Sequence, residues 1–357
     1  MTITERVPLA SLTTFRIGGP ARFVAECSNE DDIEAALAFA RERGLPFFVL
    51  GGGSNTLASD EGFEGVIIRP MFGEGPLFED QPDGRVLLTA GAGAAWDALA
   101  ASAAERGLWG IENLSGIPGT LGGAVVQNIG AYGAALSQTF AWAEAFDTET
   151  GSVRRFLPAA CAFGYRDSAF KRSAGRYIIM RTALSLSKEA APNFSYHDPN
   201  RSYKDLSRAL SANERPSAAE VRAAILSIRA DKFPDLSKEG TAGSFFENPI
   251  LPEAAANALR ARYPELPLFP MPETADIKVP LGWILDHVLH LRGYELGTAR
   301  LFERQAMVIA ARDGATAHDV DALAREVAER VLDATGIEIE REVHSLYASK
   351  NSFHRAK

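Results

Sequence analysis

Two glycine-rich loops constrain the fold of this chain more than any other feature of its sequence. The first, GGGSNT at 51–56, follows a short apolar run at 46–50 that reads as a buried strand. Residues 22–27 read as an earlier strand, and a helix that stops near Gly44 joins the two. The sequence therefore predicts a β-α-β unit that ends in a loop whose glycines let backbone N–H groups approach an anion.

The second loop, GIPGTLGG at 116–123, adds weight to a phosphate-binding interpretation. It lies in a glycine-dense run at 110–133 that has little periodicity and is too long for an idle connection. Two such loops could hold both phosphates of a dinucleotide, with Gln127, Asn128 and Tyr132 lining a ring or ribose. Neither loop matches the Gly-x-Gly-x-x-Gly or P-loop pattern. A tight turn, and amides that only satisfy buried backbone groups, stay open as alternatives.

The second half of the chain changes in character near residue 216. Ser217 and Glu220 form a capping box at the start of a helical pattern. Further patterns predict helices at 252–263, 280–290 and 316–335 and a strand at 306–310. A separate α/β domain is therefore expected to begin nearby.

The tail alternates between apolar and charged residues from residue 337 onward. Ile337, Ile339 and Val343 fall on one face of the predicted strand, and Glu342 and His344 fall on the other. Without further information, a solvated strand glutamate is the simpler interpretation of Glu342.

Composition and charge exclude several classes of protein. A net charge of −9 argues against a general nucleic-acid binder, and the basic cluster at 154–181 is either an anion site or a solvated face. Cys27 and Cys161 allow no disulfide framework, and the six histidines lack zinc spacing, so no metal site is expected. No signal peptide and no apolar run of membrane-spanning length is visible, so we expect a cytoplasmic protein without membrane association.

Two further motifs carry polar groups suited to chemistry. In FGYRDSAFK at 163–171, aromatic residues alternate with charges that could receive a carboxylate or pyrophosphate, although an amphipathic strand is the alternative. In GSFFENP at 243–249, Ser244 has no Gly-x-Ser-x-Gly elbow and no Ser-His-Asp order around it, so a hydrolase is a weak interpretation.

The order of the motifs resembles that of the UDP-N-acetylenolpyruvoylglucosamine reductases, in the subgroup with a YRDSxF motif. The resemblance covers nearly the whole chain and rests on the blocks TTFRIGGPA (13–21), VLGGGSNTL (49–57), GIPGTLGGAVVQNIGAYG (116–133), FGYRDSAFK (163–171), RADKFPD (229–235), AGSFFENP (242–249), RQA (304–306) and EREV (340–343).

The resemblance implies an α+β protein. Its FAD-binding fold would be the two-lobed type of vanillyl-alcohol oxidase, with a separate α/β substrate-binding domain. The FAD-binding region would span 1–212, with lobes at about 1–69 and 70–212, the substrate domain 213–336, and a C-terminal strand in 337–357 would return to the active site. Non-covalent FAD would be reduced by NADPH and would then reduce UDP-N-acetylglucosamine enolpyruvate to UDP-N-acetylmuramate. No nucleic acid and no obligate protein partner is expected.

By resemblance, three residues carry the chemistry. Arg166 would stabilise the negative charge that develops on the substrate carboxylate, as an enolate requires. Glu342 would orient that carboxylate or share a proton with it. Ser244 would give the α carbon its proton, and such a weak acid must be polarised by neighbours.

The resemblance also assigns binding residues. Tyr165, Lys232, Asn248 and Gln305 would hold the UDP-sugar, with Tyr203, or Tyr196 as its rival, as a capping tyrosine. The cofactor would contact Gly51, Gly52, Gly53, Ser54, Asn55, Thr56, Ser115, Gly116, Ile117, Pro118, Gly119, Gly122, Gly123, Gln127, Asn128, Gly130, Ala131 and Tyr132. Glu247 stands where the family often has lysine, which puts the local phosphate contacts in doubt.

Two other functions remain open at this point. One is another FAD-dependent oxidase or dehydrogenase of the same fold. Such enzymes often tether the flavin through His or Cys, and neither glycine loop contains these residues. The other is a non-catalytic nucleotide-sugar-binding protein, which would need the loops but not Arg166, Ser244 and Glu342 together.

Overall fold

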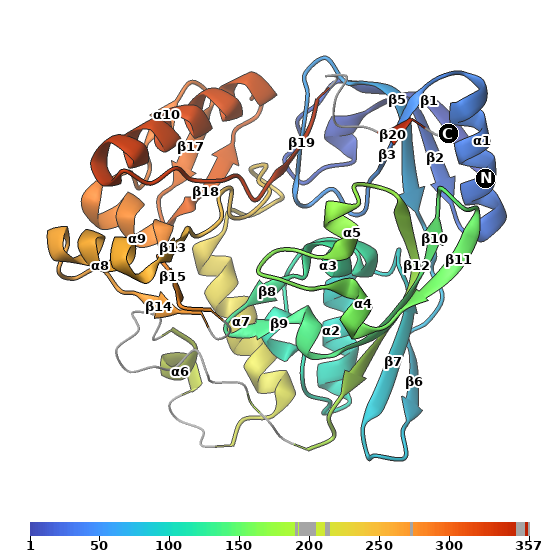
Figure 1. The fold of residues 1–357 in the computed structure, drawn as a ribbon, viewed down its shortest axis with the longest axis horizontal. Coiled ribbons are helices and arrows are strands. Elements are labelled where there is room, and N and C mark those ends of the chain that lie inside the picture. Colours follow the sequence, from blue (N-terminus) through green and yellow to red (C-terminus); the bar gives the residue numbers. More distant parts are fainter. Residues whose placement is uncertain (190–191, 193–204, 211–214, 272–273, 348–353, 356–357) are drawn as a thin grey trace.

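The computed structural model describes the whole chain except residues 190–191, 193–204, 211–214, 272–273, 348–353 and 356–357. Figure 1 shows three parts arranged around the centre of the molecule. The N-terminal lobe (blue) lies at the upper right, the second lobe (cyan to green) below it, and the C-terminal part (orange to red) at the upper left. Among the described helices, none is long and apolar enough to cross a membrane.

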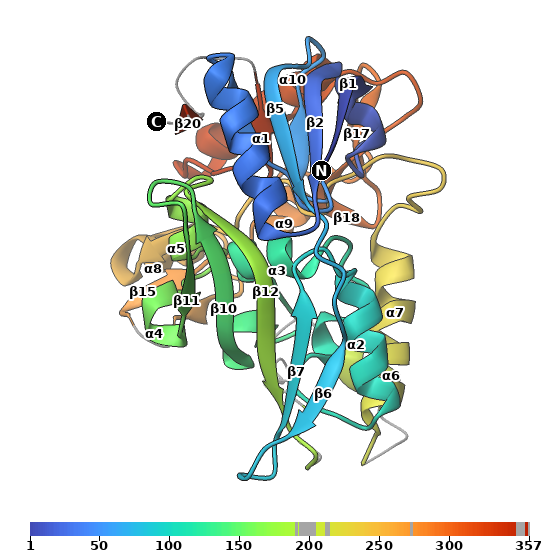
Figure 2. The ribbon, with the colours of Figure 1, turned by 90° about the vertical axis from the view of Figure 1, so that its right-hand side faces the viewer.

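The first lobe is a sheet backed by one helix. Its strands, in neighbouring order, are β1 (Thr2–Pro8), β2 (Pro20–Cys27), β5 (Phe63–Pro70), β3 (Pro46–Val49) and β20 (His354–Arg355). The helix α1 (Glu30–Glu42) begins at Asn29, whose side chain accepts from the Asp32 N–H, and its apolar face packs on the sheet (Figure 2). The predicted β-α-β unit is confirmed, with β5 lying parallel between β2 and β3.

The second lobe is an antiparallel sheet covered by α2 and α3, which share its apolar core. Its strands, in neighbouring order, are β11 (Ser152–Phe156), β10 (Phe140–Asp147), β12 (Tyr177–Leu186), β7 (Val86–Gly91) and β6 (Leu77–Asp80). The remaining elements are α2 (Trp96–Glu105), the 3₁₀ turns η2 (Glu112–Leu114) and η3 (Leu136–Gln138), α3 (Leu121–Gln127), α4 (Pro158–Cys161), α5 (Ala169–Arg172) and the short hairpin β8 (Gly130–Ala131) and β9 (Ala134–Ala135).

Two expectations for this lobe need correction. The run at 110–133 is not irregular throughout, because α3 begins at Thr120, whose side chain caps the Gly123 N–H. The small residues of this helix hid its periodicity in the sequence. The strand alternative for 163–171 is wrong, since this segment has one isolated bridge, between Gly164 and Asp167, followed by α5.

The C-terminal part has two small sheets packed with helices around one core. One sheet has the order β13 (Ile250–Pro252), β15 (Asp276–Lys278) and β14 (Phe269–Pro270), and the other β16 (Glu295–Leu296), β17 (Ala299–Phe302) and β18 (Gln305–Ala311). The helices are α8 (Glu253–Arg262), α9 (Leu281–Trp283), which continues as the π-helical η4 (Ile284–Val288), and α10 (Ala317–Thr335). The predicted elements are confirmed, except that 280–290 is π-helical in its second half.

The strand predicted from residue 337 is wrong in its position. The segment instead forms the strand β19 (His344–Leu346), which runs parallel to β4 (Thr56–Ala58) at the end of the first glycine loop. The first lobe also contains the 3₁₀ turn η1 (Leu9–Ser11). Before β19, Arg341 makes one isolated bridge to Phe246. Ile337 and Val343 are buried, as the alternation predicted. The pattern therefore gave the burial correctly, although these residues do not belong to a strand.

Helix α7 (Ala218–Lys232) joins the second lobe through its packing, together with α6 (Asp205–Leu210). Asp97 of α2 accepts from both Nη atoms of Arg222, at 2.5 and 2.8 Å, and from the Gly116 N–H at 2.5 Å. The ion pair with Arg222 is the main reason that the pKa of Asp97 lies below its usual value. The domain border at residue 213 stays a prediction, and the packing of α7 favours a border after this helix.

Replacing Asp97 by Asn tests whether this contact holds α7 in place. We expect the free energy of unfolding in urea to fall by roughly 2 kcal/mol at pH 7, because the part-buried Arg222 loses its charged partner. Since the Asp97 pKa is lowered in the folded protein, the difference between wild type and variant is full above pH about 4 and shrinks as pH falls below it.

The matched control is Asp231→Asn, on α7 itself. Asp231 pairs with Arg304, and both side chains are largely exposed, so the expected change is below about 0.5 kcal/mol. Equal losses in the two variants would contradict the role assigned to Asp97.

Candidate active site

A cavity of about 1000 Å³ lies where the two lobes and the C-terminal part meet. Both glycine loops line it, and so do residues from the segments 165–171, 229–236 and 241–248 and from the tail. This volume is at the upper end of the range for small-molecule sites. Segments that are far apart in the sequence therefore share one site.

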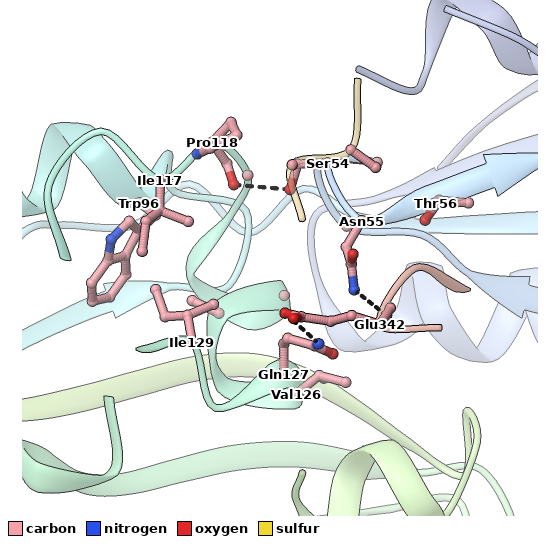
Figure 3. A pocket seen from close by; sticks show the side chains of 18 of the residues that line it. Ser54, Asn55, Thr56, Trp96, Ile117, Pro118, Val126, Gln127, Ile129 and Glu342 are labelled. Atoms are coloured by element: carbon pink, nitrogen blue, oxygen red, sulfur yellow. Dashed lines mark hydrogen bonds between the residues drawn. The ribbon is translucent and has the colours of Figure 1, made fainter. Parts of the chain in front are cut away.

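The two glycine loops contact each other directly. Ser54 Oγ donates to the Pro118 carbonyl at 2.8 Å, as Figure 3 shows. A Cβ atom on Gly52 would lie 2.6 Å from Gly119 Cα, and a Cβ atom on Gly119 would lie 2.6 Å from Ser54 Oγ. Close packing therefore favours glycine at both positions, against backbone at Gly52 and against the Ser54 side chain at Gly119, in addition to any approach of an anion.

Two side chains expected at the cofactor are directed at Glu342 (Figure 3). The Asn55 amide donates to the Glu342 carbonyl at 3.0 Å, and Asn55 O accepts from the His344 N–H at 3.0 Å. Gln127 Nε2 donates to Glu342 Oε1 at 3.4 Å. Glu342 is thus held by a residue of the first glycine loop and by a residue at the end of α3.

Arg166 is fixed in an unusual backbone conformation. Its φ of 53° is in the left-handed region, which few residues other than glycine adopt. Its Nη2 donates to the Gly130 carbonyl at 2.6 Å, and its Nε lies 2.8 Å from Glu342 Oε1 as an ion pair. Gly130 leaves room for the guanidinium, since a Cβ atom there would lie 2.7 Å from Arg166 Nη1.

Ser244 lines the same cavity, at the start of the segment that holds the Glu342 backbone. The neighbouring Phe245 N–H donates to Met307 O at 2.8 Å, and Phe245 O accepts from the Glu342 N–H at 2.9 Å. Gly243 before it has a φ of 78°, which favours glycine. Among the described residues the Ser244 hydroxyl has no hydrogen-bond partner, so it is available to a ligand.

The residues expected at the substrate reach the same cavity from one helix, one strand and two loop segments. Lys232 ends α7, Gln305 begins β18, and Asn248 donates to the Tyr165 hydroxyl at 3.2 Å while its Oδ1 accepts from the Leu281 N–H. Burial is the main reason that the pKa of Tyr165 is raised, so this phenol is neutral at ordinary pH. The candidates Tyr203 and Tyr196 lie outside the described residues.

Two residues expected at the cofactor do not line the cavity. Asn128 instead donates to Gly164 O and accepts from the Ser137 N–H, so its side chain holds neighbouring loops together. Ser115 is fully buried, and its hydroxyl has no partner among the described residues. The other residues expected at the cofactor all line the cavity.

Two residues of this cavity had no role of their own in the sequence analysis: Lys171, which was named only as part of a charged motif, and His344, which was named only for its face of the tail. Lys171 Nζ donates to the Arg166 carbonyl at 2.8 Å and lies 3.5 Å from Glu247 Oε1. Loss of surrounding water, and then the charge of Lys171, lower the pKa of His344 to about 4, so its imidazole, which stays exposed, is neutral at ordinary pH. The charged motif indicated an anion site for Lys171 but not its contact with the Arg166 carbonyl, and no signal in a single sequence separates His344 from an ordinary strand histidine.

The residues present fit FAD. The glycines of both loops expose their backbone to one cavity, and Ser54 lines it as well. The same cavity is also lined by Phe47 and Pro70 of the first lobe and by Ser244 of the C-terminal part. Such paired glycine loops accept the two phosphates of a dinucleotide, and the apolar walls accept its rings.

The two-lobed fold and this cavity define the class of FAD-dependent oxidoreductases with an additional C-terminal domain. Residues 21–157 match the model of an FAD binding domain, and residues 235–346 match that of the UDP-N-acetylenolpyruvoylglucosamine reductase C-terminal domain. The chain belongs to the UDP-N-acetylenolpyruvoylglucosamine reductase family, as its resemblance to that family predicted. The YRDSxF subgroup stays a prediction.

Named relatives and one solved structure support this assignment. A UDP-N-acetylenolpyruvoylglucosamine reductase from Pseudomonas aeruginosa is 38% identical over 95% of this chain and 98% of its own length. One from Burkholderia lata is 40% identical over 94% of each chain. The crystal structure of the reductase from Thermus caldophilus matches with a TM-score of 0.68 at 25% identity, over 97% of this chain and 100% of that chain.

Replacing Gly130 by Ala tests whether this glycine makes room for Arg166. The backbone of Gly130 is not in the left-handed region, and the added methyl group meets the movable end of Arg166 at 2.7 Å and, less closely, the Ala134 carbonyl at 3.1 Å. We expect the free energy of unfolding to change by less than about 1 kcal/mol, while a crystal structure shows the guanidinium displaced from Glu342.

Gly73→Ala is the matched control, because a Cβ atom there meets only Met71 O, at 3.9 Å. An unmoved Arg166 in the Gly130→Ala structure would contradict this account of the site.

Proposed function

We propose that this protein reduces UDP-N-acetylglucosamine enolpyruvate to UDP-N-acetylmuramate, with NADPH as the reductant and non-covalent FAD as the cofactor. The observation that carries the proposal is the convergence of Arg166, Glu342 and Ser244, from three distant segments, on one cavity that both glycine loops line. A protein that only binds a nucleotide sugar has no need of this convergence. The reaction consumes one NADPH and one proton for each alkene reduced.

The proposed chemistry adds a hydride to one carbon of the alkene and a proton to the other. The chemistry supplied by bound FAD is hydride transfer, from NADPH to the β carbon of the enolpyruvyl group. Negative charge then develops on the carboxylate that is conjugated to the alkene. A fixed cation next to that carboxylate lowers the barrier, because it need not reorganise as the charge forms.

Arg166 is the residue suited to this task. Its guanidinium is tethered to Gly130 O and Glu342, which leaves a defined edge for a ligand carboxylate. Glu342 balances the arginine charge before the substrate arrives. Next to the substrate carboxylate, Glu342 would orient that group or share a proton with it.

Ser244 is proposed to give the α carbon its proton. A hydroxyl with an ordinary, very high pKa can do so only to a strongly basic carbon, and an enolate is such a base. The available hydroxyl of Ser244, in the cavity that Arg166 also lines, supports this role. Lys232, Tyr165, Asn248 and Gln305, which line the same cavity, would hold the UDP-sugar.

The test of the function compares the purified yellow protein with and without the enolpyruvyl sugar under anaerobic conditions. We expect NADPH oxidation only when the sugar is present, with one UDP-N-acetylmuramate formed for each NADPH consumed. A colourless protein would overturn every flavin-dependent function. Rapid NADPH oxidation in air without the sugar would favour an oxidase of the same fold.

Ser244→Ala tests the proton donor. In anaerobic stopped-flow measurements, we expect flavin reduction by NADPH to stay within about 2-fold of wild type, since this half-reaction needs no proton on the α carbon. Flavin reoxidation by the sugar should slow by roughly 100-fold or more, the range for a lost general acid.

The control is Ser237→Ala, which removes a hydroxyl that contacts Asp235 on the surface of the same region. Its two half-reactions should match wild type. Similar mild losses in both half-reactions of Ser244→Ala would remove Ser244 from the role of proton donor.

A further inference from the structure

A lysine that the proposed mechanism does not use lies directly beside Arg166. Lys171 Nζ donates to the Arg166 carbonyl at 2.8 Å, and its other close partner is Glu247 Oε1, at 3.5 Å. Both side chains are 21% exposed, so the contact is enclosed. The backbone that Lys171 holds is the left-handed one of Arg166, which needs support from its surroundings to persist.

We propose that Lys171 is a positioning residue, which keeps the Arg166 guanidinium against Glu342 by holding the Arg166 backbone. This inference rests on the proposed function. The direction of an arginine side chain depends on its φ, and a φ of 53° aims this side chain at Gly130 and Glu342. Without the ammonium, the backbone can relax toward the common negative φ, and the guanidinium leaves its place.

Glu247 gives the ammonium a fixed position. Its own N–H donates to Glu340 O at 2.9 Å, and the next residue back, Phe246, bridges to Arg341, so it is anchored next to the tail that carries Glu342. Lys171 belongs to α5 of the second lobe. The pair therefore links the side of the cavity that carries Arg166 to the side that carries Glu342. Glu247 itself does not line the cavity.

A direct contact between Lys171 and the substrate is the competing explanation, because Lys171 also lines the cavity. The two explanations differ in how Lys171 depends on Arg166. A direct contact would stabilise the substrate whether Arg166 is present or not. A positioning residue acts through Arg166, and its removal has no further effect once Arg166 is gone.

A double-mutant cycle separates them. The variants are Lys171→Met, Arg166→Ala and the combination, each as the FAD-loaded full chain. Flavin reoxidation by UDP-N-acetylglucosamine enolpyruvate is followed by anaerobic stopped flow, and the affinity of the oxidised protein for the same sugar is measured by calorimetry. Arg172→Met is the matched control, since Arg172 is the next residue of α5 and pairs with Asp167 instead.

We expect Lys171→Met to slow reoxidation by about 10- to 100-fold and to weaken binding of the sugar, with reduction by NADPH within about 2-fold of wild type. The double variant should match Arg166→Ala within about 2-fold in both measurements. Lys171→Arg, which can still donate to the carbonyl, should recover part of the rate, and Arg172→Met should behave as wild type.

Losses that multiply in the double variant would overturn the inference and leave the proposed function standing. A wild-type flavin that the sugar does not reoxidise would overturn the proposed function, and this inference with it. If Lys171→Met does not fold, Glu247→Gln replaces it in the same cycle, with a smaller expected loss that again vanishes in the Arg166→Ala background.

Discussion

The ion pair between Arg166 and Glu342 is the interaction on which the rest of the site depends. Its two atoms lie 2.8 Å apart, and each partner is held by a different part of the chain. The Glu342 backbone is held by Asn55 of the first lobe and by Phe245 of the C-terminal part. Arg166 is held by Gly130 and Lys171 of the second lobe. The pair forms only when all three parts are in register.

Local patterns predicted much of the fold because capping and burial leave a signal in neighbouring residues. The helix that follows Thr316 and ends before Gly336 could be placed within a residue, since its capping box, apolar repeat and C-terminal glycine all agree. Helix α3 was not predicted, because glycine and alanine occupy positions at which larger apolar residues would show a helical repeat. The alternation in the tail predicted burial correctly but placed the strand wrongly. Strand pairing depends on a partner strand, here β4, which the alternation does not specify.

The site was predictable only in part, and for a related physical reason. Glycine loops indicate close approach of something to the backbone. The sequence does not show that the backbone of the second loop, at Gly119, packs against Gly52. The amide of Asn55 looks like a ligand donor from its loop, but in the fold it holds the backbone of Glu342. The role of Lys171 depends on the φ of a residue five positions away, which no spacing rule reports.

Several positive charges share this cavity, and this explains why each of them needs a fixed partner. The chain carries a net charge of −9, yet Arg166, Lys171, Arg229 and Lys232 all reach one cavity, which suits an anionic ligand. Burial lowers the pKa of Arg229, and its Nε donates to Gly116 O at 3.0 Å, so a backbone carbonyl partly replaces the lost water. Free cations in such a space would repel one another and move. Carbonyls and the carboxylates of Glu342 and Glu247 hold them apart instead, and cations held in this way keep their positions while charge develops on a ligand.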